Sequence, residues 1–151
     1  MMTSPMEIAL EEARAAAARG EVPVGAVVTD AAGAPISRAG NEVEARRDPS
    51  AHAEMLALRA ATAATGDKVL PAATLWVTLE PCAMCAAAAS FFRVRRIVFG
   101  AYDPKGGAVE HGPRFFAQPT CHHAPETIGG VREQEAGALL RSFFGGLRIG
   151  S

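Results

Sequence analysis

The sequence lacks the features that mark membrane, exported and disulfide-rich proteins. Arg, Glu or Gly interrupts each apolar run before the roughly 20 residues needed to cross a bilayer, and no basic leader precedes an apolar core near the N-terminus. Only three of the 151 residues are cysteines. We therefore expect no membrane segment and a cytoplasmic location, where cysteines are better used as metal ligands than as disulfides.

A strong net charge is also missing, because the formal charge of the chain is −1. This balance argues against general, charge-driven binding to nucleic acid. The two ends nevertheless differ: residues 1–90 hold 7 Lys and Arg against 11 Asp and Glu, whereas residues 91–151 hold 8 against 5. The C-terminal third can therefore offer a basic face to RNA phosphates, which require local and not overall positive charge.

No internal repeat, low-complexity tract or linker divides the chain. Its length, with 49% hydrophobic and 21% charged residues, is typical of a globular protein with a real core. We therefore expect a single domain over residues 1–151.

The order of local patterns predicts an α/β fold, in which helices cover both faces of a mixed sheet of five strands. Capping signals at Ser4-Pro5 and Asp48-Pro49 begin two of the helices, with Asp48 as the expected N-cap of the second. The helices are expected from Ser4 to Gly20, from Asp48 to Gly66, from Pro81 to about Phe92 and from Glu133 to Phe144. The strands are expected at Val22–Thr29, Ile36–Asn41, Thr74–Leu79, Arg96–Gly100 and Thr127–Val131, with a charged loop before Asp48 and a long loop over Ala101–Glu126.

Two short motifs, thirty residues apart, carry the chemistry of the chain. The first is His52-Ala53-Glu54 and the second is Pro81-Cys82-Ala83-Met84-Cys85. One imidazole and two thiolates are enough to hold a zinc ion while a fourth position stays open, as in catalytic zinc sites. Glu54 is not needed as a ligand and is free to move protons. The combined pattern, H-x-E with P-C-x-x-C, is the signature of zinc-dependent nucleobase deaminases, so we expect one Zn²⁺ per chain.

Both motifs are expected at the start of a helix. The positive end of the helix dipole favours thiolates, so Cys82 and Cys85 should ionise readily. His52 and Glu54 present a difficulty, because side chains two residues apart on an ideal helix diverge by about 200°. An irregular start of the helix must therefore complete the site.

Other interpretations of the motifs remain open. A structural zinc would need a fourth ligand from the long loop, where His111, Cys121, His122 and His123 are candidates, and it would leave Glu54 unexplained. A redox C-x-x-C would leave His52 without a role. The cluster Cys121-His122-His123 could also form a second metal site.

The chain resembles the bacterial tRNA-specific adenosine deaminases over nearly its whole length. The segments that carry this resemblance are Gly20–Val27, Asp48–Glu54, Val77–Cys85, Asp103–Gly107 and the Phe143-Phe144 pair of the last helix. The resemblance implies a three-layer, cytidine deaminase-like α/β/α fold, a homodimer, and conversion of the wobble adenosine of an arginine tRNA to inosine.

The resemblance also implies roles for individual residues. His52, Cys82 and Cys85 would hold the zinc ion, and Glu54 would move protons during hydrolysis at C6 of adenine. Asn41 would contact the purine with help from the backbone N–H of Ala53. The groove for the tRNA anticodon stem-loop would be lined by Asp103, Lys105 and Phe144.

Two competing functions stay open on the sequence alone. A deaminase of a free base or nucleoside, such as guanine or cytosine, uses the same chemistry and needs only a small closed pocket. A non-catalytic RNA-binding or partner subunit could keep zinc for structure, but it would have no need of Glu54, which is present here.

Overall fold

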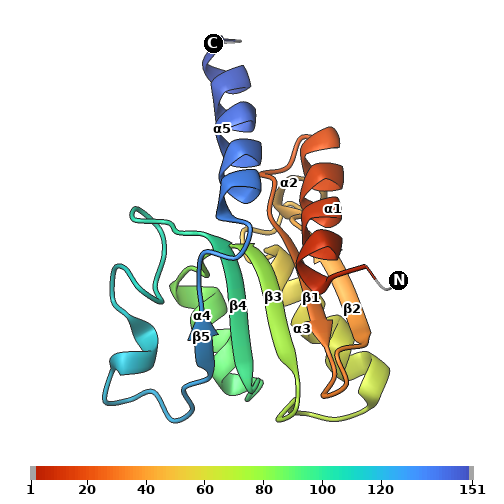
Figure 1. Cartoon of the computed structure of the whole chain (residues 1–151), viewed down its shortest axis with the longest axis vertical. Helices are drawn as coiled ribbons and strands as arrows, with labels where there is room; N and C mark the ends of the chain where they lie inside the picture. Colours follow the sequence, from red (N-terminus) through yellow and green to blue (C-terminus); the bar gives the residue numbers. More distant parts are fainter. Residues whose placement is uncertain (1–2, 150–151) are drawn as a thin grey trace.

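A mixed sheet of five strands forms the middle layer of the protein (Figure 1). The computed structural model describes residues 3–149 and the side chains of residues 3–145. The sheet order is β2-β1-β3-β4-β5, with β1 antiparallel to both neighbours and β3, β4 and β5 parallel, which confirms the predicted mixed sheet. The strands are β1 Gly25–Thr29, β2 Pro35–Gly40, β3 Thr74–Leu79, β4 Arg96–Ala101 and β5 Glu126–Ile128.

Helices cover both faces of this sheet, as the sequence predicted. On one face lie α1 (Pro5–Ala18) and α5 (Glu133–Ile149), and on the other lie α3 (Ala53–Thr65) and α4 (Ala83–Phe91) (Figure 1). Two hydrophobic clusters fill the spaces between the layers. Because both faces are covered, the central strands are apolar along nearly their whole length. Among the described residues, none of the helices has the length and apolar character that spanning a membrane requires.

Gly25 allows α1 to lie unusually close to β1. A Cβ atom at this position would lie 1.9 Å from the carbonyl oxygen of Ala9, so only glycine fits. The N–H of Gly25 donates to Oγ1 of Thr78 at 3.1 Å, which ties the start of β1 to the carboxyl end of β3. The segment before β1 is therefore held beside the junction of β3 and α4, where the second motif lies.

Several predicted boundaries differ from the observed ones. β1 begins at Gly25 and not at Val22, since Pro23 has no N–H to donate to a neighbouring strand. β5 covers Glu126–Ile128 and not Thr127–Val131, and α5 continues to Ile149, beyond the expected end at Phe144. Two short elements lie where only loops were predicted, because three or four residues are too few for a periodic pattern: α2 at Val43–Arg46 and a 3-10 helix at Phe115–Ala117.

Candidate active site

The start of α3 is irregular in the way the site requires. The prediction that Asp48 is its N-cap is wrong, because the Asp48 carboxylate accepts hydrogen bonds from the backbone N–H (2.9 Å) and hydroxyl (2.7 Å) of Ser50 and closes a turn before the helix. The N-cap is instead His52, whose backbone is extended (φ −73°, ψ 151°). Since His52 lies outside the helical turn that holds Glu54, the angular conflict of an ideal helix does not arise.

His52, Cys82 and Cys85 form a compact cluster of metal ligands. Nδ1 of His52 lies 3.6 Å from Sγ of Cys82 and 3.6 Å from Sγ of Cys85, and the three ligand atoms all lie within 4.8 Å of one another. Zinc bonds of about 2.1 Å to nitrogen and about 2.3 Å to sulfur, at tetrahedral angles, require a nitrogen-to-sulfur separation of about 3.6 Å. The cluster therefore fits a single zinc ion.

The two thiols differ in how readily they lose a proton before a metal binds. The Cys85 thiol, which donates to Cys82, and the neighbouring His52 lower the pKa of Cys82 to about 4. The Cys82 thiolate and burial raise the pKa of Cys85. The pair thus shares one proton in the metal-free chain. The expectation that both cysteines ionise readily holds for Cys82, whereas Cys85 requires an added cation.

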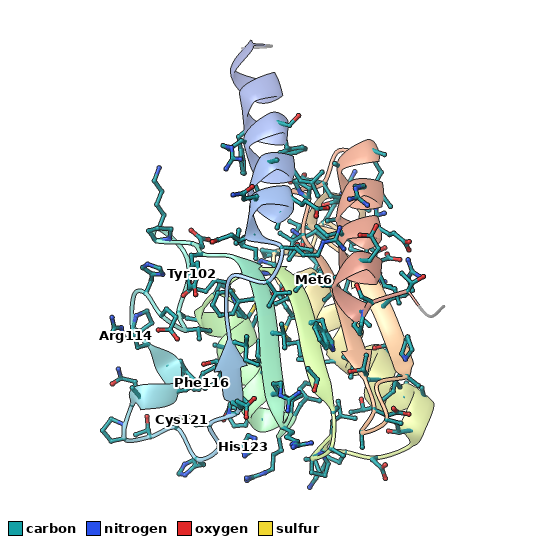
Figure 2. All side chains as sticks on the ribbon, in the orientation of Figure 1. Met6, Tyr102, Arg114, Phe116, Cys121 and His123 are labelled. Atoms are coloured by element: carbon teal, nitrogen blue, oxygen red, sulfur yellow. The ribbon has the colours of Figure 1, made fainter. Side chains whose placement is uncertain are left out.

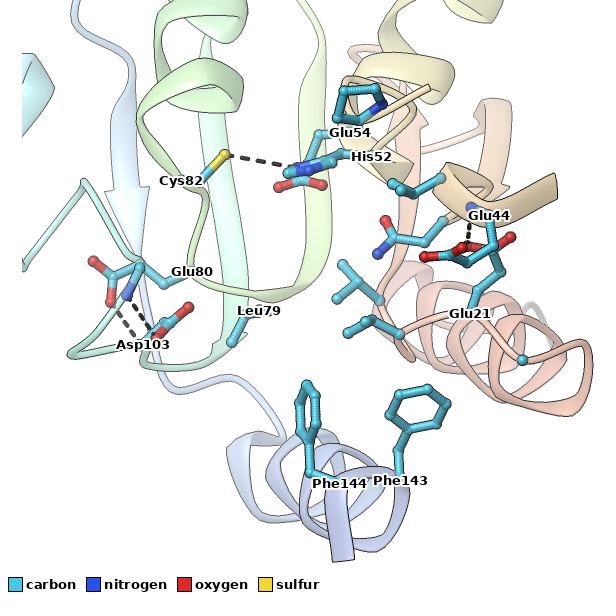
Figure 3. A pocket seen from close by; sticks show the side chains of 17 residues that line it. Glu21, Glu44, His52, Glu54, Leu79, Glu80, Cys82, Asp103, Phe143 and Phe144 are labelled. Atoms are coloured by element: carbon cyan, nitrogen blue, oxygen red, sulfur yellow. Dashed lines mark hydrogen bonds between the residues drawn. The ribbon is translucent and has the colours of Figure 1, made fainter. Parts of the chain in front are cut away.

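Glu54 is buried beside this cluster, with 4% of the residue exposed. Burial, together with the negative charge of Cys82, raises the pKa of Glu54 to about 7, against the effect of its own backbone N–H. A carboxyl group that titrates near neutral pH is suited to both accepting and returning a proton. Figure 3 shows the Glu54 carboxylate close to the His52 ring and the Cys82 sulfur.

Asn41, which follows β2, caps α3 from outside the helix. Its Oδ1 accepts a hydrogen bond of 2.8 Å from the N–H of Ala53, the first residue of the helix. The His52 side chain makes no capping hydrogen bond, and its ring faces the two cysteines. The Ala53 N–H is thereby engaged within the protein. One lone pair of Oδ1 is used in this way, and the NH₂ group of Asn41 supplies the donors that its side chain offers a ligand in the pocket.

A cavity of about 720 Å³ lies above the metal cluster. Figure 3 shows Glu80 and Asp103 on one side of it, Glu21 and Glu44 on the other, and Phe143 and Phe144 reaching in from α5. The structure therefore gathers most of the predicted site residues around one cavity, namely Asn41, His52, Glu54, Cys82, Asp103 and Phe144. Ala53 is fully buried and does not line the cavity.

A second hollow of about 1040 Å³ adjoins the first and shares Val22, Leu79, Asp103, Gly106 and Phe144 with it. Lys105, a predicted substrate contact, lines this second hollow together with Arg141. Phe144 borders both hollows and is 45% exposed. Phe143 is partly buried and lines the first cavity as well.

Two buried glutamates at the rim of the cavity were missed by the sequence analysis. Glu21 accepts hydrogen bonds from the N–H groups of Glu44 (3.0 Å) and Ala45 (2.9 Å). Glu80 accepts from several N–H groups of the long loop. Burial alone would raise the pKa of Glu80, but these hydrogen bonds and one from His111 outweigh it and lower that pKa. A proline close to each glutamate was the only local hint in the sequence that they lie in fixed loops.

The long loop holds no second metal centre. His123 Nε2 lies 2.7 Å from the carbonyl oxygen of Val94, and the Cys121 thiol donates to the carbonyl oxygen of His123 at 3.3 Å. Figure 2 shows Cys121 and His123 at the lower edge of the molecule, on the segment that leads to β5. Within residues 3–149, no further group of three His, Cys, Asp or Glu side chains lies close enough together to hold an ion.

Residues 2–101 match the family described as the zinc-binding region of cytidine and deoxycytidylate deaminases. The chain belongs to this family. A tRNA-specific adenosine deaminase of Agrobacterium fabrum (strain C58) is 57% identical over 140 residues, which are 92% of this chain and 91% of that protein. The resemblance that the motifs indicated is confirmed.

Two solved structures extend the comparison. A tRNA deaminase that performs A-to-I editing at the wobble position of transfer RNA superimposes with a TM-score of 0.89 at 55% identity, over 92% of this chain and all of that chain. The guanine deaminase from Nitrosomonas europaea superimposes with a TM-score of 0.75 at 27% identity, over 92% of this chain and 82% of that one. The predicted cytidine deaminase-like fold is confirmed.

Proposed function

We propose that the protein hydrolyses the wobble adenosine of a tRNA, specifically an arginine tRNA, to inosine with release of ammonia. The identity to tRNA-specific adenosine deaminases supports this reaction. The observation that carries the proposal is the pairing of the two hollows. The pocket above the metal cluster has no lysine or arginine in its lining, and it adjoins a groove that has both.

The chemistry of the pocket suits a neutral base. In the part of the chain that the structure describes, no lysine or arginine lines the first cavity, whereas five acidic residues do: Glu21, Glu44, Glu54, Glu80 and Asp103. A phosphate group inside it would be repelled. Lys105 and Arg141 line the adjoining groove, where the phosphates of a longer nucleic acid would find partners.

In the proposed mechanism, His52, Cys82 and Cys85 hold one zinc ion. A bound zinc ion lowers the pKa of a coordinated water from 15.7 to about 7 and so makes a nucleophile available at neutral pH. Glu54 takes up a proton as water adds to C6 of adenine and delivers it to N1. It then takes the proton of the new C6 hydroxyl and passes it to the amine, which leaves as ammonia while C6 becomes the carbonyl of inosine. Its buried carboxyl group, with a pKa near neutrality, is suited to each of these transfers.

The substrate contacts follow from the groups left free in the pocket. The NH₂ group of Asn41 donates to an acceptor on the purine, and Ala53 contributes through Asn41, to which its N–H is bound. Phe144 stacks on a base, since it is an exposed aromatic ring at the border of both hollows. Asp103 and Lys105 contact the anticodon loop.

Ammonia release tests the proposed substrate. Zinc-loaded protein is incubated with an arginine tRNA anticodon stem-loop that carries adenosine at the wobble position, and separately with guanine, cytosine and adenosine. We expect ammonia and inosine from the RNA alone. The matched control is the same stem-loop with guanosine at that position, which should give no ammonia. Ammonia from a free base, with no inosine in the RNA, would favour a deaminase of the guanine deaminase type.

We also propose that the chain is one deaminase domain that acts in the cytoplasm as a homodimer. Phe91 at the end of α4 is 78% exposed, which supports a partner covering this region. Sedimentation equilibrium should give the mass of two chains for the native protein and of one chain for Phe91→Glu. A native monomer at micromolar concentration would contradict the dimer.

A further inference from the structure

The carboxylate of Glu80 occupies the junction between β3 and α4, two residues before Cys82. Its side chain is completely shielded from solvent. A buried carboxylate is costly unless hydrogen bonds replace the lost water, so its partners indicate what the group is for. All of them come from one segment, residues 103–111.

Five donors of this segment converge on the two oxygens of Glu80. Oε1 accepts from the N–H of Asp103 (2.9 Å) and lies 2.8 Å from Nδ1 of His111. Oε2 accepts from the N–H groups of Val109 (3.2 Å), Glu110 (2.8 Å) and His111 (3.1 Å). The segment is thus wrapped around a single carboxylate, much as loops of consecutive N–H groups surround a bound anion.

The same segment is closed by further contacts at close range. A Cβ atom on Gly107 would lie 2.5 Å from Cδ of Glu80, so the backbone passes directly over the carboxylate. The N–H of Ala108 donates to the carbonyl oxygen of Pro81 at 2.9 Å. Asp103 then turns the chain, since its Oδ1 accepts from the N–H groups of Lys105 (3.1 Å) and Gly106 (3.0 Å).

We propose that Glu80 is a positioning residue that folds residues 103–111 into one wall of the active site and thereby fixes where Asp103 and Lys105 meet the RNA. This inference rests on the proposed function for its substrate. Figure 3 shows Glu80 beside Asp103 on this wall, across the cavity from Glu21 and Glu44.

A glutamine cannot replace this carboxylate. The four backbone groups are donors only, and an amide nitrogen placed against them would set donor against donor. In its best orientation the amide nitrogen would face His111, whose Nδ1 can accept in one tautomer, but the N–H of Asp103 would then lose its acceptor. The end of the segment that leads to Lys105 is therefore the part that should loosen.

The test compares three zinc-loaded variants with the native protein: Glu80→Gln, His111→Ala and Glu110→Gln. The last is the matched control, because the exposed side chain of Glu110 lies in the same segment while only its backbone N–H binds Glu80. Deamination of the stem-loop gives KM and kcat, metal analysis gives the zinc content, and limited trypsin digestion gives the rate of cleavage after Lys105.

For Glu80→Gln we expect KM for the stem-loop to rise about tenfold and cleavage after Lys105 to accelerate by a similar factor, with kcat changed less than about threefold. Zinc should stay at one per chain. His111→Ala, which removes one of five donors, should show the same pattern at about two- to threefold. Glu110→Gln should behave like the native protein.

Native KM and native cleavage in both Glu80→Gln and His111→Ala would overturn the inference. A loss of zinc and kcat with unchanged KM would also overturn it, because Glu80 would then act on Cys82 and not on the loop. If Glu80→Gln does not fold, His111→Ala decides between these outcomes. The digestion requires no substrate, so a native protein inactive on the stem-loop would contradict the proposed function without changing the result for the loop.

Discussion

Two glutamates beside the metal cluster are buried to the same degree and behave in opposite ways. Glu54, at the start of α3, is 4% exposed, and Glu80, at the end of β3, is 2% exposed. Burial raises the pKa of Glu54 to about 7, whereas five hydrogen bonds overcome burial and lower the pKa of Glu80. The difference lies in the partners and not in the depth of the site.

This difference in hydrogen-bond partners suits Glu54 to proton transfer and Glu80 to holding a loop in place. A carboxyl group with few donors around it keeps both protonation states within reach at neutral pH, as proton transfer requires. A carboxylate surrounded by donors stays ionised and holds its partners in place. In the proposed mechanism, the active site uses the same type of side chain once to react and once to organise a loop.

Replacing the reactive glutamate should have the largest effect of any change considered. Glu54→Gln keeps the shape of the side chain but cannot carry a proton between groups, so we expect turnover of the stem-loop to fall by about 10³-fold or more. Zinc should remain at one per chain, since His52, Cys82 and Cys85 are unchanged. Ammonia release and metal analysis on the same sample measure both.

Glu54→Ala serves as the second variant and should lose turnover to a similar extent. A variant that loses its zinc together with its activity would show that Glu54 supports the ligands. Glu54 would then be a structural residue like Glu80, and the two glutamates would not differ in role.

The pH dependence of stability should differ in sign between the two residues. In the metal-free chain, Glu54 has a pKa of about 7 when folded and about 4.5 when unfolded, so the folded state loses stability as pH rises from about 4.5 to 7. The full loss, on the order of 3 kcal/mol, is present above pH 7 and absent in Glu54→Gln. Urea unfolding of both metal-free proteins at pH 5 and pH 8 measures it.

Glu80 should show the opposite dependence. Its pKa is lowered on folding, so its contribution to stability is present above the unfolded pKa of about 4.5 and is lost as the pH falls below that value.

For Glu54, a difference in the free energy of unfolding between the native protein and Glu54→Gln that is the same at pH 5 and at pH 8 would contradict the assignment.

The sequence predicted Glu54 and the metal ligands better than it predicted Glu80 and the loop that surrounds it. His52, Glu54, Cys82 and Cys85 were found because their spacing along the chain reflects a local requirement of zinc chemistry. β3 was predicted with its observed bounds, since four of its six residues are β-branched or aromatic.

Glu80 and its loop depend on contacts between distant segments. Glu80 accepts hydrogen bonds from N–H groups of residues 23 to 31 positions later in the chain. The residues next to Glu80 in the sequence do not predict these partners. The cap of α3 was misassigned for the same reason: Asp48 has the right residue type, but Asn41 provides the acceptor from the end of another strand. Local preferences predict which groups need partners, and the fold decides which partners they receive.

A substitution at Gly107, whose backbone passes over the Glu80 carboxylate, should change stability by a smaller amount. In Gly107→Ala the new methyl group would lie 2.5 Å from Cδ of Glu80 and 2.6 Å from the carbonyl oxygen of Asp103, so the loop must shift. We expect a loss of about 1–3 kcal/mol in the free energy of unfolding, measured by urea titration of the zinc-loaded protein. Gly106→Ala is the control, because its methyl group would meet only the end of the Asp103 side chain, at 3.0 Å. An equal loss in both variants would mean that Glu80 holds the loop loosely.

Asn41 should give the smallest change in stability, and it combines the two roles in one side chain. Its Oδ1 holds the start of α3, and Asn41 also lines the pocket. Asn41→Ala removes the acceptor for the Ala53 N–H and should cost about 1 kcal/mol of stability. Asn41→Asp keeps an acceptor, which the start of α3 favours, so most of that stability should return in the zinc-loaded protein. Neither variant can donate to the substrate, so both should lose turnover. Recovery of turnover in Asn41→Asp would assign Asn41 to the organising group beside Glu80, with no part in binding the base.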